Sequence, residues 1–322
     1  MLLSFVIPCY RSALTIGEVV EDIAATVADR HSYSYEVILV NDSSPDNTWD
    51  VIKNIAQKNN NVMAINLSKN FGQHAAIMAG LNHVSGDIVV CLDDDGQTPP
   101  NQLFSLVDNL GQYDVAMATY ETKKHSSFRN FGSWVNEVMA RSLLGKPKDI
   151  KLSSYFAMKR YIADEITNYK NSYPNLAGLI LRATRSIINV SIDHKEREVG
   201  ESGYTISKLL GLWMNGFTAF SVKPLRVASL CGAIFAGLGF LYGIYVVINR
   251  IMNPYVPLGF SATMVVMLVI GGLILLVLGM IGEYIGRIYI SISQAPQFII
   301  REVVNNARQE SLELEHTTKL AR

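Results

Sequence analysis

The sequence has no excess of charge of either sign, and charged residues and cysteines are scarce. Its 322 residues include 28 Lys and Arg against 28 Asp and Glu, so the formal net charge is zero. Binding to nucleic acid through phosphate contacts needs an excess of Lys and Arg, so we expect no nucleic-acid partner. With 49% hydrophobic residues and only 17% charged residues, the chain is also too apolar to be disordered as a whole.

Cysteine-based sites and two common nucleotide-binding motifs are missing. Cys9, Cys91 and Cys231 lie far apart in apolar runs, which predicts buried thiols rather than disulfides or a zinc site. No G-x-G-x-x-G and no G-x-x-x-x-G-K-[ST] occurs, which argues against a Rossmann dinucleotide site and a P-loop. The start, MLLSFVIPCY, enters a strand pattern without a basic region or cleavage site, so we expect no signal peptide and a cytoplasmic N-terminal domain.

Two stretches, 227–248 and 258–282, carry no charge over the roughly 20 residues that a helix needs to cross a bilayer. The link between them holds one charge, Arg250, whereas several Lys and Arg residues flank the pair. By the positive-inside rule both flanks, and therefore both termini, should be cytoplasmic at the inner membrane. The flanking cations are Lys208, Lys223, Arg226, Arg287 and Arg301.

Residues 206–220 have apolar and aromatic side chains at helical spacing, which favours an amphipathic helix in the membrane interface. Packing of this helix against the soluble domain is the alternative. The expected organisation is a cytoplasmic domain at 1–205, the interfacial helix at 206–225, two transmembrane helices within 226–285, and a cytoplasmic segment at 286–322.

The N-terminal domain alternates short Val-, Ile- and Leu-rich runs with helical patterns. This order is typical of an α/β fold with a doubly wound, mostly parallel sheet, whose ligands bind outside the carboxyl ends of the strands. Strands are predicted at 3–8, 35–41, 62–67, 88–92 and 114–119, and helices at 15–30, 46–57 and 71–83.

Three consecutive aspartates, Asp93, Asp94 and Asp95, follow the apolar strand at 88–92. Like charges this close raise one another's pKa values unless a cation lies between them. Mg²⁺ and Mn²⁺ prefer oxygen ligands, and Mg²⁺ is typically held by one or two carboxylates plus substrate phosphates. In an extended chain Asp93, Asp95 and Gln97 point to the same side, which predicts a metal site. A solvated turn whose aspartates cap the next helix is the alternative.

Four short motifs occur in a fixed order: Pro8-Cys9-Tyr10, Asn41-Asp42-Ser43-Ser44, Asn70-Phe71-Gly72 and DDDGQTPP at 93–100. Together they resemble family-2 glycosyltransferases, which have the nucleotide-sugar-binding GT-A fold. HKEREVGESGY at 194–204 and GEYIGRIY at 282–289 narrow the resemblance to polyprenyl-phosphate glycosyltransferases. These include bactoprenol glucosyltransferases, undecaprenyl-phosphate formamidoarabinose transferases and dolichol-phosphate mannose synthases. The resemblance spans about residues 3 to 305.

The resemblance implies roles for individual positions. Pro8, Tyr10 and Asp42 would hold the nucleoside, and Asp93 and Asp94 match the start of the Asp-x-Asp motif. The family's ligands for Mg²⁺ or Mn²⁺ fall on Asp93, Asp95 and Gln97, with the diphosphate completing the shell.

Two further segments match phosphate-binding positions of the family. Arg197, Gly200 and Ser202 match an Arg-x-x-Gly-x-Ser segment near the donor phosphates. Arg129 and Ser133, one helical turn apart, resemble the pair that receives the lipid phosphate. The residues expected to carry the reaction are therefore Asp95, Arg197, Arg129 and Ser133, although solvated side chains are the alternative for both arginines.

The sequence departs from the family at several positions. Arg11 and Ser12 replace an Asn-Glu pair, and Gly203 replaces a lysine. Ser154 stands where many relatives carry an aspartate with an assigned catalytic-base role, which serine cannot play. A phosphate monoester is mostly dianionic at pH 7 and has no proton that must be removed, so we still expect an active enzyme.

The expected function is transfer of a sugar from a nucleotide-diphosphate sugar to polyprenyl (undecaprenyl) phosphate at the lipid bilayer, by inverting displacement. UDP is the expected nucleotide and GDP the alternative; specificity should lie in residues 120–180, and relatives imply a homo-oligomer, such as a tetramer. A transferase that acts directly on a glycan is less favoured, because the Gln-x-x-Arg-Trp motif of polysaccharide synthases is missing. A membrane carrier is disfavoured because the spans have no internal charge.

Overall fold

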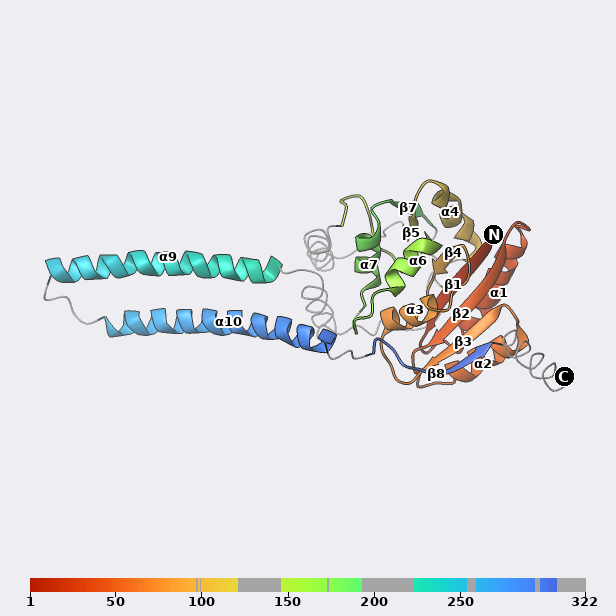
Figure 1. Ribbon diagram of the computed structural model, residues 1–322, viewed down its shortest axis with the longest axis horizontal. Coiled ribbons are helices and arrows are strands. Elements are labelled where there is room, and N and C mark those ends of the chain that lie inside the picture. Colours follow the sequence, from red (N-terminus) through yellow and green to blue (C-terminus); the bar gives the residue numbers. More distant parts are fainter. Residues whose placement is uncertain are drawn as a thin grey trace, which may run out of the picture. The chain divides into compact units, whose positions relative to one another are not determined.

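The computed structural model describes residues 1–96, 98, 100–120, 146–172, 174–192, 223–253, 259–292 and 296–305. The chain divides into two compact units (Figure 1). The first comprises Met1–Gly203 with Ala295–Arg322, and the second comprises Tyr204–Gln294.

The first unit is built on a mostly parallel sheet of eight strands, in the order β7-β5-β6-β4-β1-β2-β3-β8. Strand β6 runs antiparallel to its neighbours β4 and β5, and β8 runs antiparallel to β3 at the edge of the sheet. The other neighbouring pairs are parallel. The strands are β1 (Leu2–Cys9), β2 (Ser34–Asn41), β3 (Val62–Leu67), β4 (Ile88–Cys91), β5 (Val115–Thr119), β6 (Phe156–Lys159), β7 (Ile187–Ser191) and β8 (Ile300–Asn305).

Helices cover both faces of this sheet. On one face, α1 and α4 contribute to a continuous apolar core with alternate residues of β1, while α3, α6 and α7 lie over the other face. Central strands covered on both sides are buried along nearly their whole length, as in β1 and β4. The helices are α1 (Ile16–Ala28), α2 (Thr48–Lys58), α3 (Gln73–Leu81), α4 (Leu103–Val107), α6 (Arg160–Thr167) and α7 (Leu176–Ala183), with short 3₁₀ turns η1 (Pro100–Gln102) and η2 (Asp108–Gly111).

Sequence periodicity explains which face each helix buries. In α1 the buried residues recur at the spacing of one helical face, and they include Ile16, Val19 and Ile23. Helix α3 is instead buried over most of its length, and a Cβ on Gly80 would lie only 2.5 Å from Val6 Cγ1. The absent side chain thus lets the C-terminal end of α3 approach β1 closely.

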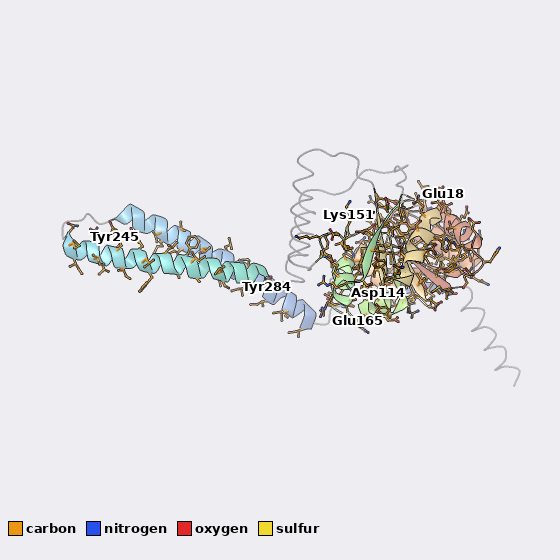
Figure 2. The ribbon with its side chains drawn as sticks, turned by 90° about the horizontal axis from the view of Figure 1, so that it is seen from above. Glu18, Asp114, Lys151, Glu165, Tyr245 and Tyr284 are labelled. Carbon is orange, nitrogen blue, oxygen red and sulfur yellow. The ribbon has the colours of Figure 1, made fainter. Side chains whose placement is uncertain are left out.

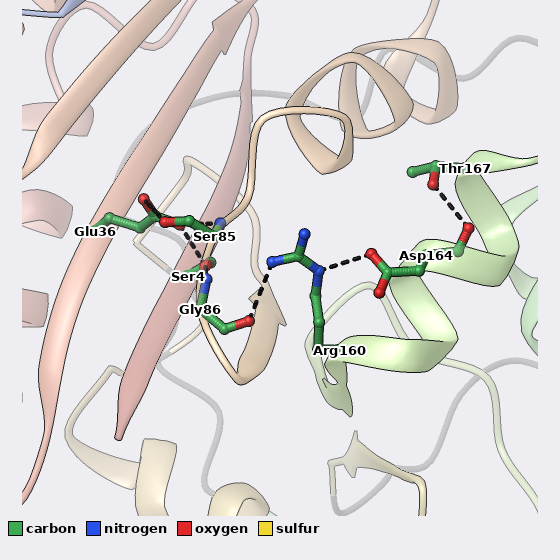
Figure 3. A network of polar contacts seen from close by, with 7 residues as sticks. All are labelled: Ser4, Glu36, Ser85, Gly86, Arg160, Asp164 and Thr167. Atoms are coloured by element: carbon green, nitrogen blue, oxygen red, sulfur yellow. Dashed lines mark hydrogen bonds and ion pairs between the residues drawn. The ribbon is translucent and has the colours of Figure 1, made fainter. Parts of the chain in front are cut away.

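The amino-terminal edge of the sheet is closed by an internal polar network (Figure 3). Glu36 accepts hydrogen bonds from Ser4 Oγ at 2.5 Å, Ser85 N at 2.6 Å and Ser85 Oγ at 2.7 Å. Gly86 N donates to Ser4 Oγ at 2.7 Å, and Arg160 donates to the Gly86 carbonyl at 3.4 Å. Because these groups satisfy one another, this edge is structural, and a ligand site is to be sought at the opposite edge.

The last strand returns the chain to the sheet unit after the paired apolar helices. Strand β8 pairs with β3, and Lys53 Nζ lies 2.6 Å from Glu302 Oε1. Val304 is buried in the core, at 3% exposure. No strand was predicted within the 286–322 segment, and β6 and β7 were not predicted either.

The second unit contains two long apolar helices, α9 (Lys223–Met252) and α10 (Phe260–Ile292). Each contains a stretch long and apolar enough to cross a membrane, Ala228–Asn249 and Val269–Gly286. Large apolar side chains project outward along these helices (Figure 2), and Phe240 is 71% exposed. Outward-facing apolar surface over this length is typical of helices that contact lipid.

The α/β fold with a doubly wound sheet and a pair of apolar helices is confirmed, and the first five strands lie within two residues of their predicted positions. Cys9 and Cys91 are buried free thiols, as expected. The predicted interfacial helix at 206–220 lies outside the described residues. The last residues of the predicted 206–225 segment belong to α9, which begins at Lys223.

Candidate active site

The carboxyl ends of β1 and β2 form one wall of the candidate site. Arg11 and Ser43, which follow these strands, have left-handed backbone conformations with φ of 60° and 52°. Such conformations are rare for residues with a side chain and cluster at functional sites. They are held by hydrogen bonds, since Arg11 N donates to Ser44 Oγ at 2.8 Å. Tyr10 is 45% exposed, and its ring lies 5.6 Å from the Arg11 guanidinium carbon. This wall therefore presents an aromatic face that a nucleobase can stack on.

Asp42, at the end of β2, organises the neighbouring loop. Its carboxylate accepts hydrogen bonds from Phe71 N at 2.7 Å and Gly72 N at 2.8 Å. The Asn70 side chain donates to the Asp42 carbonyl at 3.2 Å. Asp42 is only 3% exposed, and this burial raises its pKa while the two backbone N–H groups lower it. The Asn-Phe-Gly motif is thus tied to the Asp42 motif, so that α3 begins beside the ends of β1 and β2.

Asp93 receives hydrogen bonds from two residues distant in sequence. Gln73 Nε2, at the start of α3, donates to Asp93 Oδ1 at 2.8 Å. Ser154 Oγ, just before β6, donates to Asp93 Oδ2. Gln73 and Ser154 together, called the Asp93 clamp below, fix the orientation of this carboxylate.

Asp94 turns back toward β1 rather than toward the clamp. Its Oδ2 accepts a hydrogen bond from Tyr10 N at 3.0 Å, and its carbonyl accepts one from Thr15 Oγ1 at 2.6 Å. Burial raises the Asp94 pKa to about 6, although Tyr10 and Ser12 lower it in part. The three aspartates therefore differ in role, because Asp94 holds the β1 loop while Asp93 faces the clamp.

The negative charges of Asp93 and Asp95 act on the neighbouring Tyr120. The pKa of the Tyr120 phenol is raised to about 12. Burial is the largest cause, the negative charge of Asp93 is the next, and that of Asp95 contributes less. No group of three or more His, Cys, Asp or Glu side chains converges within the residues described. Two carboxylates completed by phosphate and water oxygens are a donor set that suits Mg²⁺ or Mn²⁺, and Mg²⁺ is seldom held by an all-protein cage.

A cavity of about 200 Å³ adjoins the Asp93 clamp on the α3 and α7 side of the sheet. Its polar part is lined by Gln73, His74, Ser153 and Ser154, while its other walls are apolar side chains of α3, β5, β6 and α7 together with Leu152. The site therefore combines the Asp93 carboxylate with a small, half-open cavity beside it.

The sheet unit matches the model of "Glycosyl transferase family 2" over residues 4–199, and residues 223–288 match the "GtrB C-terminal hairpin". The chain belongs to glycosyl transferase family 2. It is therefore a glycosyltransferase, as its sequence predicted. The hairpin match covers most of both apolar helices, α9 and α10.

Full-length relatives lie within the same family. One is the "Undecaprenyl-phosphate 4-deoxy-4-formamido-L-arabinose transferase" of Edwardsiella ictaluri, 32% identical over 312 residues and 94% of each chain. Another is the "Uncharacterized glycosyltransferase YkcC" of Bacillus subtilis, 32% identical over 303 residues and 93% of each chain. Among solved structures, glucosyl-3-phosphoglycerate synthase of Mycobacterium tuberculosis, in complex with Mn²⁺ and UDP-glucose, matches with a TM-score of 0.50 at 18% identity. The match covers 67% of this chain and 77% of that one, which supports the GT-A-like fold.

The fold brings part of the predicted site together. The three aspartates lie at the carboxyl edge with Pro8, Tyr10 and Asp42, because β1, β2 and β4 are neighbours in the sheet. Gln97, Arg129, Ser133, Arg197 and Ser202 lie outside the described residues, so their roles stay predictions.

Sequence reasoning missed the Asp93 clamp and the loop contacts around Ser44. Gln73 directly follows the Asn-Phe-Gly motif, and Ser154 had been singled out only as a replaced aspartate. Neither residue type signals a contact with Asp93, since the partners are 20 and 61 positions away.

Proposed function

We propose that this glycosyltransferase moves a sugar from a UDP-linked nucleotide-diphosphate sugar to undecaprenyl phosphate. The observation that carries the proposal is the full-length match to the undecaprenyl-phosphate transferase of E. ictaluri, which includes both the sheet unit and the paired apolar helices. The acceptor named for that relative is itself a membrane lipid, which fits a transferase with two apolar helices. The proposed product is a lipid-linked sugar for modification of a cell-envelope glycan.

The donor would lie across the carboxyl edge of the sheet. The exposed ring of Tyr10, with Pro8 before it, would stack on the nucleobase, and Asp42 would keep the adjoining loop in place. Asp93, Asp95 and Gln97 would hold Mg²⁺ or Mn²⁺, and bound metal supplies stabilisation of the charge that develops on the departing diphosphate. The M. tuberculosis structure, which contains Mn²⁺ and UDP-glucose, supports such a donor for this fold.

No catalytic base is required in this scheme. A lipid phosphate is mostly dianionic at neutral pH and can attack the anomeric carbon without losing a proton. Ser154 instead donates to Asp93, so it contributes to the orientation of a carboxylate rather than to proton transfer. Arg129 and Ser133 would receive the lipid phosphate, while Arg197 and Ser202 would bind the diphosphate. Positioning and electrostatic stabilisation then account for catalysis, with inversion at the anomeric carbon.

The test is transfer of radiolabel from UDP- and GDP-sugars to undecaprenyl phosphate by the full chain in detergent. We expect a lipid-soluble product that requires Mg²⁺ or Mn²⁺ and disappears with EDTA or in Asp95→Asn. Asp149→Asn, at an exposed loop position, is the matched control and should keep full activity. Label that enters a water-soluble glycan instead of the lipid would overturn the acceptor assignment.

We also propose that both flanks of the helix pair are cytoplasmic. The supporting feature is the positive charge at the start of α9 (Lys223) and near the end of α10 (Arg287). Asn253→Cys, at the other end of α9, should react with a membrane-impermeant thiol reagent in intact cells. Asp149→Cys should react only after lysis; the reverse pattern would place the catalytic unit on the opposite side of the membrane.

A further inference from the structure

The cavity beside the Asp93 clamp has a polar mouth and an apolar floor. Gln73 and Ser154 at the mouth are exposed and donate hydrogen bonds to Asp93. The floor residues come from four different elements and are buried to between 1% and 4% exposure. They are Ile77 of α3, Met117 of β5, Phe156 of β6, and Leu176 and Ile180 of α7.

The size of the cavity limits what it can hold. An apolar cavity of about 150 Å³ lined by Leu, Ile and Phe accommodates a benzene-sized molecule. At about 200 Å³, this cavity takes one small ring or a substituent of a ring. A polyprenyl chain, with tens of carbon atoms, exceeds it many times over, so the lipid tail is not its occupant.

The position of the cavity identifies the part of the donor that would enter it. Its mouth residues are the same two that orient Asp93, which the proposed function places at the metal and the diphosphate. The group attached to the diphosphate is the sugar. A sugar leaving the diphosphate toward α7 therefore reaches the cavity directly.

The chemistry of the floor then sets the class of sugar. A sugar hydroxyl buried against Ile77, Met117 and Ile180 would find no hydrogen-bond partner among these side chains, and such burial is unfavourable. The polar side chains at the mouth, which include Gln73, His74 and Ser154, can pair with sugar hydroxyls there, but they do not form the floor. A methyl group or a deoxygenated carbon, in contrast, gains by leaving water for this floor.

We propose that the cavity selects a donor sugar that carries a small apolar substituent, namely a deoxy carbon with its methyl group or the methyl of an N-acyl group. This inference rests on the proposed function and names the substrate class of the same site. The selective residues are the floor side chains, because a hydroxyl placed against them finds no hydrogen-bond partner among them.

The test measures donor binding without turnover, using the full chain in detergent with Mn²⁺ and no acceptor. The probes are UDP, UDP-glucose, UDP-6-deoxyglucose and UDP-N-acetylglucosamine, titrated by calorimetry. We expect one of the two substituted donors to bind about tenfold or more tightly than UDP-glucose, since a single methyl-sized difference in a fitted pocket has an effect of this size. The donor that binds more tightly shows whether the cavity takes the methyl group of a deoxy carbon or that of an N-acyl group.

A pair of variants links this preference to the cavity. Ala177→Leu, on the cavity-lining face of α7, should fill the space and bring the substituted donors to the affinity of UDP-glucose, with UDP binding unchanged. Arg182→Leu adds the same side chain at an exposed position of α7 and should keep the preference. Leu is a good helix former, so neither change should unfold α7.

The outcomes separate this inference from the proposed function. Equal or tighter binding of UDP-glucose by the unaltered chain, or a preference that survives Ala177→Leu, overturns the inference while transfer to undecaprenyl phosphate can still occur. Failure of UDP and of all three UDP-sugars to bind overturns the UDP-linked donor of the proposed function and the inference together.

Discussion

Replacing Asp94 by asparagine should stabilise the protein at neutral pH. Asp94 is held by Tyr10 N at 3.0 Å, and an asparagine oxygen can accept the same hydrogen bond without a buried charge. Burial raises the Asp94 pKa from 3.8 to about 6 in the folded protein. The folded chain therefore keeps a proton that the unfolded chain has already released between these pH values.

The sign and size of the effect follow from proton linkage. Below about pH 4 the Asp94 carboxyl is protonated in both the folded and the unfolded chain, so it does not change the free energy of unfolding. As the pH rises toward 6, folding becomes progressively less favourable. Above pH 6 the full penalty is present, about 3 kcal/mol for a shift of about two pKa units. Asp94→Asn removes this penalty, which corresponds to an increase in Tm of up to about 6–12 °C for a domain of this size.

The assay is thermal unfolding of the full chain in detergent with EDTA, between pH 4.5 and 8. The difference in Tm between Asp94→Asn and the unaltered chain should be small at pH 4.5, grow through pH 6 and then level off. Asp149→Asn, at an exposed position, should show no such pH-dependent difference. An Asp94→Asn variant that is less stable at pH 7.5, or a difference independent of pH, would refute the reasoning.

Three further outcomes test other parts of the structure. Ser154→Ala removes a donor of the Asp93 clamp and should weaken Mn²⁺ binding, measured by calorimetry in the presence of UDP, about 10- to 100-fold. The control Ser105→Ala, at an exposed position of α4, should leave Mn²⁺ affinity unchanged. Equal affinities in the two variants would show that the clamp does not act on the metal. Gly86→Ala would place a Cβ 2.6 Å from the Leu2 carbonyl oxygen and should lower the free energy of unfolding by roughly 1–3 kcal/mol in denaturant titrations, while Gly111→Ala has open space and should not match that loss. Val304→Asp would bury a charge in β8 and should lower the Tm strongly. Val303→Asp, at the neighbouring position whose side chain points to the other face and is 37% exposed, should lower the Tm much less. Equal losses of Tm would contradict the pairing of β8 with β3.

These predictions depend on features that differ in how far the sequence revealed them. Strands β1 to β5 and helices α1 to α3 were predicted because their apolar spacing is local and repeats within each segment. Strand β6, with the sequence FAMK, has none of the Val, Ile and Leu residues that marked the predicted strands, and β8 follows a stretch dominated by the apolar helices, so local patterns were too weak to reveal either. The paired apolar helices were evident from composition alone.

The sequence by itself determined the α/β class, the apolar helix pair, the acidic cluster at 93–95 and the family resemblance, since each depends on residues close together in the chain or on ordered motifs. Only the tertiary structure decided that Asp94 turns to Tyr10 while Asp93 is held by Gln73 and Ser154. It also decided that side chains of α3, β5, β6 and α7 line a small, half-open and mainly apolar cavity. The physical reason is that strand order and helix packing join residues tens of positions apart, and the spacing of neighbouring residues carries no information about such partners.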